Sequence, residues 1–183
     1  FKSNNSLTTL EYESPRDGDG HGSHTASTAG GNANVQASIN GTSIGAITGI
    51  APRARVAAYK VCWGSAISGT DACYSADMVK AIDDAVSDGV DVLNHSISGT
   101  LNNFVDPVET AYLNATTAGV FVAASAGNSG PGNAVAHISP WIMTVAASTH
   151  DRQSIAETTG NAQSRDTGQI HCHRIHVRRI HRQ

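Results

Sequence analysis

Apolar runs and helical periods alternate through the middle of this 183-residue chain. Strands are expected at residues 55–61, 90–97, 120–126 and 141–147, and helices at residues 75–88 and 106–118. Strands that alternate with helices of this length require right-handed crossovers and a parallel sheet. The sequence therefore predicts an α/β fold of three layers, in which helices cover both faces of a mostly parallel sheet.

The ends of the two expected helices carry ordinary capping residues. Ser75 is a suitable N-cap for the first, and Gly89 follows it as a stop. Asp106 can cap the second, because Pro107 is tolerated in a first turn and Glu109 lies near the positive end of the helix dipole. These signals fix the order of helix and strand along the chain.

A turn rich in glycine, aspartate and histidine precedes this alternating region. Residues 17–31 read DGDGHGSHTASTAGG, and we expect a short helix at 22–29 that ends in a left-handed glycine cap at 30–31. His21 lies between two glycines, which allow a substrate to approach its ring, so it is a candidate general base. The structural alternative is that His21 and His24 face one side of a helix that Asp17 and Asp19 cap.

Two further segments follow strands of the expected parallel sheet. Residues 96–99 end one strand, and residues 126–130 end the next. Ligands of such sheets bind at the carboxyl ends of the strands. Asn128 can direct its amide into a cleft there, although the sequence Asn-Ser-Gly-Pro is equally suited to a simple turn.

Four strings in the chain together resemble the subtilisin-like serine proteases, in particular the secreted plant-type branch that also occurs in bacteria. They are GHGSHTAST at 20–28, APRARVAAYKVCW at 51–63, ASAGNSGP at 124–131 and SPWIMTVAAST at 139–149. The resemblance implies a secreted endopeptidase with the subtilisin-like fold and a polypeptide substrate. It covers residues 14–151.

The resemblance assigns a role to each candidate residue. His21 corresponds to the catalytic base, His24 to a supporting histidine, and Asn128 to the side-chain donor of the oxyanion hole. Residues 96–99 correspond to a segment that pairs with the substrate as an added strand, with Ser98 in place of a glycine. The expected substrate-binding residues are Ser96, Ile97, Ser98, Gly99, Ala126 and Gly127.

Two members of the expected triad are not found in these residues. Residues 1–16 contain no D(T/S)G motif for the orienting aspartate, and no GTSxAxP motif for the nucleophile follows residue 147. GTSIGA at 41–46 does not fit that motif, so Ser43 is expected to be a loop serine, and the DTG at 166–168 lies on the wrong side of His21. The chain is therefore interpreted as a fragment of an endopeptidase, or alternatively as an inactive, peptide-binding remnant.

The resemblance also implies a disulfide between Cys62 and Cys73, with two unpaired buried thiols as the alternative. Cys172 has no expected partner. A loop of this length, once closed in an oxidising compartment, contributes on the order of 3 kcal/mol.

Composition separates the last residues from the rest. Residues 171–183 contain four Arg, four His and no acidic residue, so we expect a partial catalytic domain at 1–151 and an irregular tail at 152–183. The net charge of −3 argues against nucleic acid as a partner. No apolar run reaches the roughly 18 residues that span a membrane. No secretion signal opens the chain, and no metal or cofactor is expected. The weak alternatives are a metal site at His171, Cys172, His173 and His176, or one at His21 and His24 with Asp17 and Asp19.

Overall fold

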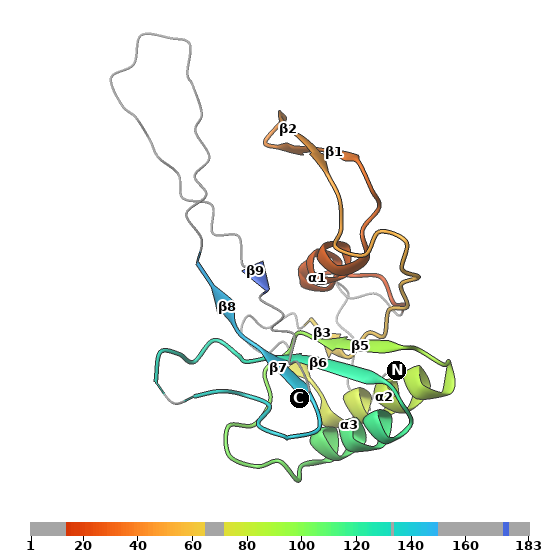
Figure 1. Ribbon diagram of the computed structural model, residues 1–183, viewed down its shortest axis with the longest axis vertical. Helices are drawn as coiled ribbons and strands as arrows, with labels where there is room; N and C mark the ends of the chain where they lie inside the picture. The colour runs from red at the N-terminus through yellow and green to blue at the C-terminus, as the bar shows by residue number, and fades with distance from the viewer. Residues whose placement is uncertain (1–13, 65–71, 133, 150–173, 176–183) are drawn as a thin grey trace, which may run out of the picture.

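The computed structural model describes residues 14–64, 72–132, 134–149 and 174–175. Its centre is a parallel sheet in the order β5 (Val92–His95), β6 (Phe121–Ser125) and β7 (Met143–Val145). The helices α2 (Ser75–Ser87) and α3 (Pro107–Thr117) pack against each other and against this sheet (Figure 1). The predicted α/β class with parallel strands is confirmed.

Alternate residues of the strands face the two sides of the sheet. Val122 and Ala124 are almost fully buried in β6, and they belong to the side that packs on α3 with Tyr112. Their neighbours Val92 and Phe121, which are register partners, remain 61% and 49% exposed. Within the described residues α2 and α3 therefore cover one face, and the helical cover expected on the second face stays a prediction.

The two predicted helix starts differ in their capping. The carboxylate of Asp106 accepts hydrogen bonds from the backbone N–H groups of Val108 (2.8 Å) and Glu109 (3.0 Å), as expected. Ser75, in contrast, is not the N-cap of α2: that position is Tyr74, which makes no side-chain capping bond. Ser75 is already helical, so its hydroxyl lies one position too late to cap.

The strand predicted at residues 55–61 is wrong. This run forms no strand among the described residues, and Val56 is 57% exposed. The extended pairing begins one residue later, where β3 (Cys62–Trp63) pairs antiparallel with β4 (Ala72–Cys73). An apolar run becomes a strand only where a neighbour accepts its hydrogen bonds, and the described chain places no strand beside 55–61.

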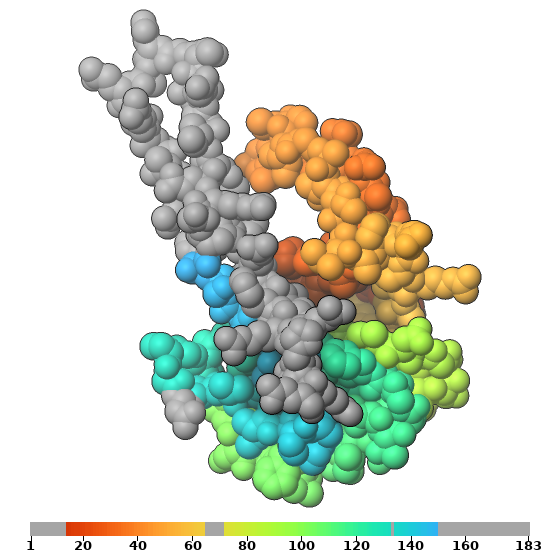
Figure 2. All heavy atoms as spheres, viewed as in Figure 1, coloured from red at the N-terminus to blue at the C-terminus, as the bar shows by residue number. Residues whose placement is uncertain are grey.

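Residues 32–53, in which no strand is predicted, contain a β-hairpin. Strands β1 (Val35–Ile39) and β2 (Thr42–Ile47) pair antiparallel around Asn40 and Gly41, whose φ angles are 49° and 81°. Asn-Gly is the preferred sequence for such a two-residue turn, so the signal was present. Ser43, expected in a loop, lies exposed in β2, and the hairpin stands out from the rest of the described chain (Figure 2).

Helix α1 (His21–Gly30) includes the predicted helix at 22–29, but the expected left-handed cap is wrong. Gly31 has a φ of −64° and is extended. Glycine is needed there for close approach, because a Cβ on Gly31 would lie 2.4 Å from the Ser27 carbonyl oxygen, and one on Gly49 would lie 2.3 Å from the Gly31 nitrogen. The chain returning from the hairpin thus packs directly on the end of α1.

The final described strands join the two parts of the chain that composition separates. β8 (Ala147–Ser148) pairs antiparallel with β9 (Arg174–Ile175). The boundary at 151 stays a prediction, and the proposed metal ligands His171, Cys172, His173 and His176 lie outside the described residues. No helix of the described chain is long and apolar enough to cross a membrane.

The expected disulfide is present. Cys62 and Cys73 are bonded, and they are also register partners in the β3–β4 pair. This bond closes a loop across a separation of 11 residues. The alternative of two free thiols is therefore excluded.

Removing this disulfide should destabilise the fold. In a Cys172→Ser background, the double variant Cys62→Ser/Cys73→Ser is expected to lose about 3 kcal/mol of unfolding free energy, because the unfolded loop regains its freedom. Urea unfolding followed by circular dichroism measures this loss, with the Cys172→Ser single variant as control. Two free thiols in that control, titrated after denaturation without reductant, would contradict the bond.

The start of α1 depends on the carboxylate of Asp17. Its Oδ1 accepts from the N–H groups of Asp19 (3.0 Å) and Gly20 (2.8 Å), and its Oδ2 accepts from Ser23 N–H (2.7 Å). These backbone bonds hold the pKa of Asp17 well below its ordinary value of 3.8. Asp17 therefore caps the helix from the preceding loop, which the structural alternative for this residue had predicted.

We expect an acid-sensitive start of α1. Because the folded pKa of Asp17 is lowered, its stabilisation is complete above the ordinary pKa of 3.8 and is lost as pH falls through the lower folded value. The amide resonances of Gly20 and Ser23 should shift only well below pH 3.8, and this shift should disappear in Asp17→Asn but persist in Asp83→Asn. A midpoint at or above 3.8 in the wild type would refute the capping role.

Candidate functional site

The carboxyl ends of β5 and β6 lie side by side, as a parallel sheet requires. The hydroxyl of Ser125 donates to the Ile97 carbonyl (3.2 Å) across the two strand ends. A Cβ placed on Gly127 would lie 3.4 Å from the Ser98 hydroxyl oxygen, and Gly127 itself has a φ of 80°. The structure therefore brings residues 96–99, here called the 96–99 segment, into contact with Ala126–Gly127. The sequence predicted both as substrate-binding residues from two separate motifs.

Ala126 is fixed from both sides. Its N–H donates to the Val145 carbonyl (2.9 Å), and its carbonyl accepts from Ala136 N–H (3.0 Å). Asn128 follows two residues later and is exposed. Among the described residues its side-chain amide has no hydrogen-bond partner, so the amide can donate to a ligand.

His21 is the first residue of α1, and its ring is exposed. The backbone N–H of His21 donates to Asp19 Oδ2 (3.1 Å), and His24, one turn along, donates its N–H to the Gly20 carbonyl (3.0 Å). Within the described chain no hydrogen bond joins the imidazole of His21 to Asn128 or to the 96–99 segment. The convergence of these two groups across one groove stays a prediction.

A buried polar network lies directly beneath the 96–99 segment, and sequence reasoning missed it. His137 and Glu109 are only 2% and 1% exposed, and His137 Nδ1 lies 2.6 Å from Glu109 Oε1. The other carboxylate oxygen, Oε2, accepts from the Ser139 hydroxyl. His137 Nε2 lies 2.8 Å from the carbonyl oxygen of Ile97. The network thus connects α3 to the predicted substrate-binding segment.

The imidazole of His137 also packs directly against the backbone of Gly99. A Cβ at Gly99 would lie 2.4 Å from His137 Cε1 and 2.6 Å from its Nδ1. Only glycine allows the backbone to lie this close to the ring. Gly99 is therefore required by contact with His137, and not by an unusual φ.

Two more polar side chains are buried beside this network. The rings of His95 and Tyr112 lie 5.4 Å apart, and His95 lies 5.4 Å from the ring of His137. Burial, together with the neighbouring His137, lowers the pKa of His95 to about 3, so His95 is neutral at physiological pH. Burial and the nearby Glu109 carboxylate raise the pKa of Tyr112.

A weak sequence signal for the network existed. The sequence places Glu109 near a helix start, and the residue shares the buried side of α3 with Val108 and Tyr112. A histidine also stands among the apolar residues at 134–138. Neither signal identifies a partner, because residues 109 and 137 are joined only by the tertiary fold.

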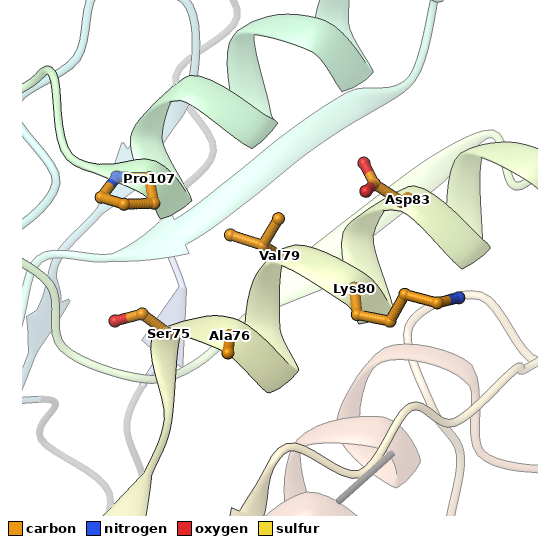
Figure 3. Close-up of a pocket in the computed structure, with 6 residues that line it drawn as sticks. All are labelled: Ser75, Ala76, Val79, Lys80, Asp83 and Pro107. Atoms are coloured by element: carbon orange, nitrogen blue, oxygen red, sulfur yellow. The ribbon is translucent and has the colours of Figure 1, made fainter. Parts of the chain in front are cut away.

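A shallow pocket elsewhere does not coincide with the predicted site. It lies between α2 and the start of α3 (Figure 3), and its lining residues are Ser75, Ala76, Val79, Lys80, Asp83 and Pro107. None of the predicted catalytic or substrate-binding residues lines it. Across the part of the chain that the structure describes, no group of three or more His, Cys, Asp or Glu side chains is arranged to hold a metal ion.

Comparison with known proteins places the chain among proteases. The model of the Subtilase family matches residues 1–171. The chain is 46% identical over 154 residues to subtilisin-like protease SBT1.6 of Arabidopsis thaliana, covering 81% of this chain and 20% of that protein. It is 47% identical over 146 residues to SBT1.5 of the same plant, covering 79% and 18%.

Solved structures give weaker likenesses. Sphericase matches with 29% identity and a TM-score of 0.45, covering 60% of this chain and 35% of its own. The prenylagaramide maturation protease PagA matches with 18% identity and a TM-score of 0.43, covering 61% and 48%.

The family match extends over most of the chain, whereas the chain spans only about a fifth of the length of the curated relatives. The family assignment therefore rests on the sequence matches. The chain belongs to the subtilases, the subtilisin-like family of serine proteases.

Proposed function

We propose that this chain is part of the catalytic domain of a secreted subtilisin-like serine endopeptidase. In this proposal His21 is the general acid and base, and Asn128 is the side-chain donor to the oxyanion. The 96–99 segment pairs with the peptide as an added strand and, with Ala126 and Gly127, lines the pocket that binds it. The substrate is a polypeptide.

The chemistry assigns one task to each group. A serine oxygen attacks the peptide carbonyl, and the imidazole of His21 accepts the serine proton and then gives it to the leaving amine. The amide of Asn128 donates to the negative oxygen of the tetrahedral intermediate. The attacking serine and the aspartate that orients His21 have no counterpart at the expected places in these 183 residues.

One observation supports this assignment above the others. The 96–99 segment and Ala126–Gly127 lie in contact where β5 and β6 end, and the exposed amide of Asn128 follows directly. A peptide laid along the 96–99 segment would bring a carbonyl within reach of that amide. The missing triad members favour the alternative, a peptide-binding remnant without activity, for these residues taken alone.

We also propose that helices cover the second face of the sheet, as the three-layer fold requires. Val92 and Phe121 form an apolar area on the sheet face that α2 and α3 leave open. Further helices of the complete three-layer domain would bury this area. The disulfide between Cys62 and Cys73 supports an oxidising, extracellular location.

Serine-directed reagents should not label this chain. Phenylmethylsulfonyl fluoride reacts with a serine that a neighbouring base activates, and no serine of the described chain lies within hydrogen-bond distance of the His21 imidazole. Intact-mass measurement after incubation should show unmodified protein. Stoichiometric labelling of a single serine would identify a nucleophile and refute the proposed division of roles.

The convergence of His21 and Asn128 can be measured directly. In a Cys172→Ser background, the variant His21→Cys/Asn128→Cys should be cross-linked efficiently by a short bismaleimide, because both side chains border one groove in the proposal. The matched control is His21→Cys/Asp83→Cys, in which Asp83 lies on α2 (Figure 3). Equal or lower yield in the first variant, read by peptide mapping, would end the protease assignment of these two residues.

A further inference from the structure

We propose that His137, held by Glu109, is a positioning residue for the peptide-binding backbone of the 96–99 segment. It acts through that backbone and does not touch the substrate. The inference rests on the proposed function for the identity of the ligand, but its structural part stands on the contacts of His137 alone.

Two hydrogen bonds from His137 bracket Ser98 and Gly99. The ring Nε2 lies 2.8 Å from the Ile97 carbonyl oxygen, and the backbone N–H donates to the Thr100 carbonyl (3.2 Å). One residue thus fixes the segment immediately before and immediately after the two positions that would pair with a peptide. The ring beneath Gly99 prevents the segment from moving inward.

The proton arrangement of the ring follows from its partners. A carbonyl oxygen only accepts, so Nε2 of His137 carries a proton and donates to Ile97. Nδ1 then shares the remaining proton with Glu109 Oε1, while Ser139 donates to Oε2. Glu109 is the group that fixes the ring in this orientation, as a carboxylate fixes histidines elsewhere.

The backbone of His137 is itself held in an uncommon conformation. Its φ is 57°, in the left-handed region that side chains rarely adopt. The hydroxyl of Thr144 donates to the His137 carbonyl and, with the Thr100 bond, holds the residue there. Such conformations persist only where the surroundings enforce them, and they cluster at functional sites.

The first test removes the ring without leaving a buried charge. The variant Glu109→Gln/His137→Asn keeps polar partners for Ser139, and asparagine tolerates the left-handed backbone. The control, Glu109→Gln, keeps the Nε2 donor, because glutamine can donate to Nδ1 and accept from Ser139. The backbone ¹⁵N order parameters of Ser98 and Gly99 should fall from about 0.85 to below about 0.6 in the double variant only.

The second test keeps every residue of the buried network. It therefore still tests the positioning role of His137 if the double variant fails to fold. Gly99→Ala places a methyl group against the His137 ring and should lower the same order parameters. Gly132→Ala is the matched control, since nothing lies within 4 Å of a Cβ at that position. Amides of α3 and β6 should stay rigid in every variant. Unchanged order parameters at 98 and 99 in both test variants would overturn the positioning role.

Peptide binding separates this inference from the proposed function. Anisotropy of fluorescein-labelled casein should show affinity about tenfold lower for Gly99→Ala and for Glu109→Gln/His137→Asn, which corresponds to one or two lost main-chain hydrogen bonds. The Gly132→Ala control should bind as the wild type does. If the wild type does not bind casein but the order parameters of Ser98 and Gly99 fall in the test variants, the peptide-binding function is refuted and the positioning role of His137 is supported. Full affinity in both test variants would overturn the positioning.

Discussion

The buried carboxylate of Glu109 is the constraint on which the organisation of the described core depends. A charge removed from water must be paired and hydrogen-bonded, or it destabilises the fold strongly. Its two oxygens contact His137 and Ser139, and its backbone carbonyl accepts from Trp141 Nε1 (2.9 Å). A single residue of α3 thereby binds three residues of the chain that leads into β7. Displacing His137 and Ser139 would leave the carboxylate unpaired.

The contacts of Glu109 also fix the edge of the sheet where a peptide would bind. The bonds of His137 to Ile97 and Thr100 transmit the position of α3 to the end of β5. Ala126 is held on its other side by β7 and by Ala136. The 96–99 segment is therefore supported on one side by a polar network, while Ser98 and Asn128 remain exposed. This division suits a site that must be rigid before its ligand arrives.

Short-range signals predicted much of the fold. The Asp106 cap, the helix α3 and the parallel pairing of the strands followed from capping residues and apolar periods, which depend only on neighbours along the chain. The strand prediction at 55–61 failed because apolar residues alone supply neither burial nor a pairing partner, and the described chain gives this run neither. The hairpin at Asn40–Gly41 was not predicted although its turn signal is local, because its strands are mostly exposed and carry no clear apolar period.

Sequence by itself determined the family of this protein and most of its alternating helices and strands, and it predicted the disulfide between Cys62 and Cys73. Short sequence motifs suffice to identify the family and the local elements, because both depend on residues that are neighbours along the chain. Only the tertiary structure decided that Glu109 and His137 meet beneath Gly99, and that the 96–99 segment touches Gly127. Those contacts join residues about thirty positions apart, through the packing of α3 and the register of β5 and β6. A local sequence pattern cannot predict these contacts, because only the tertiary fold brings residues so far apart in the sequence together.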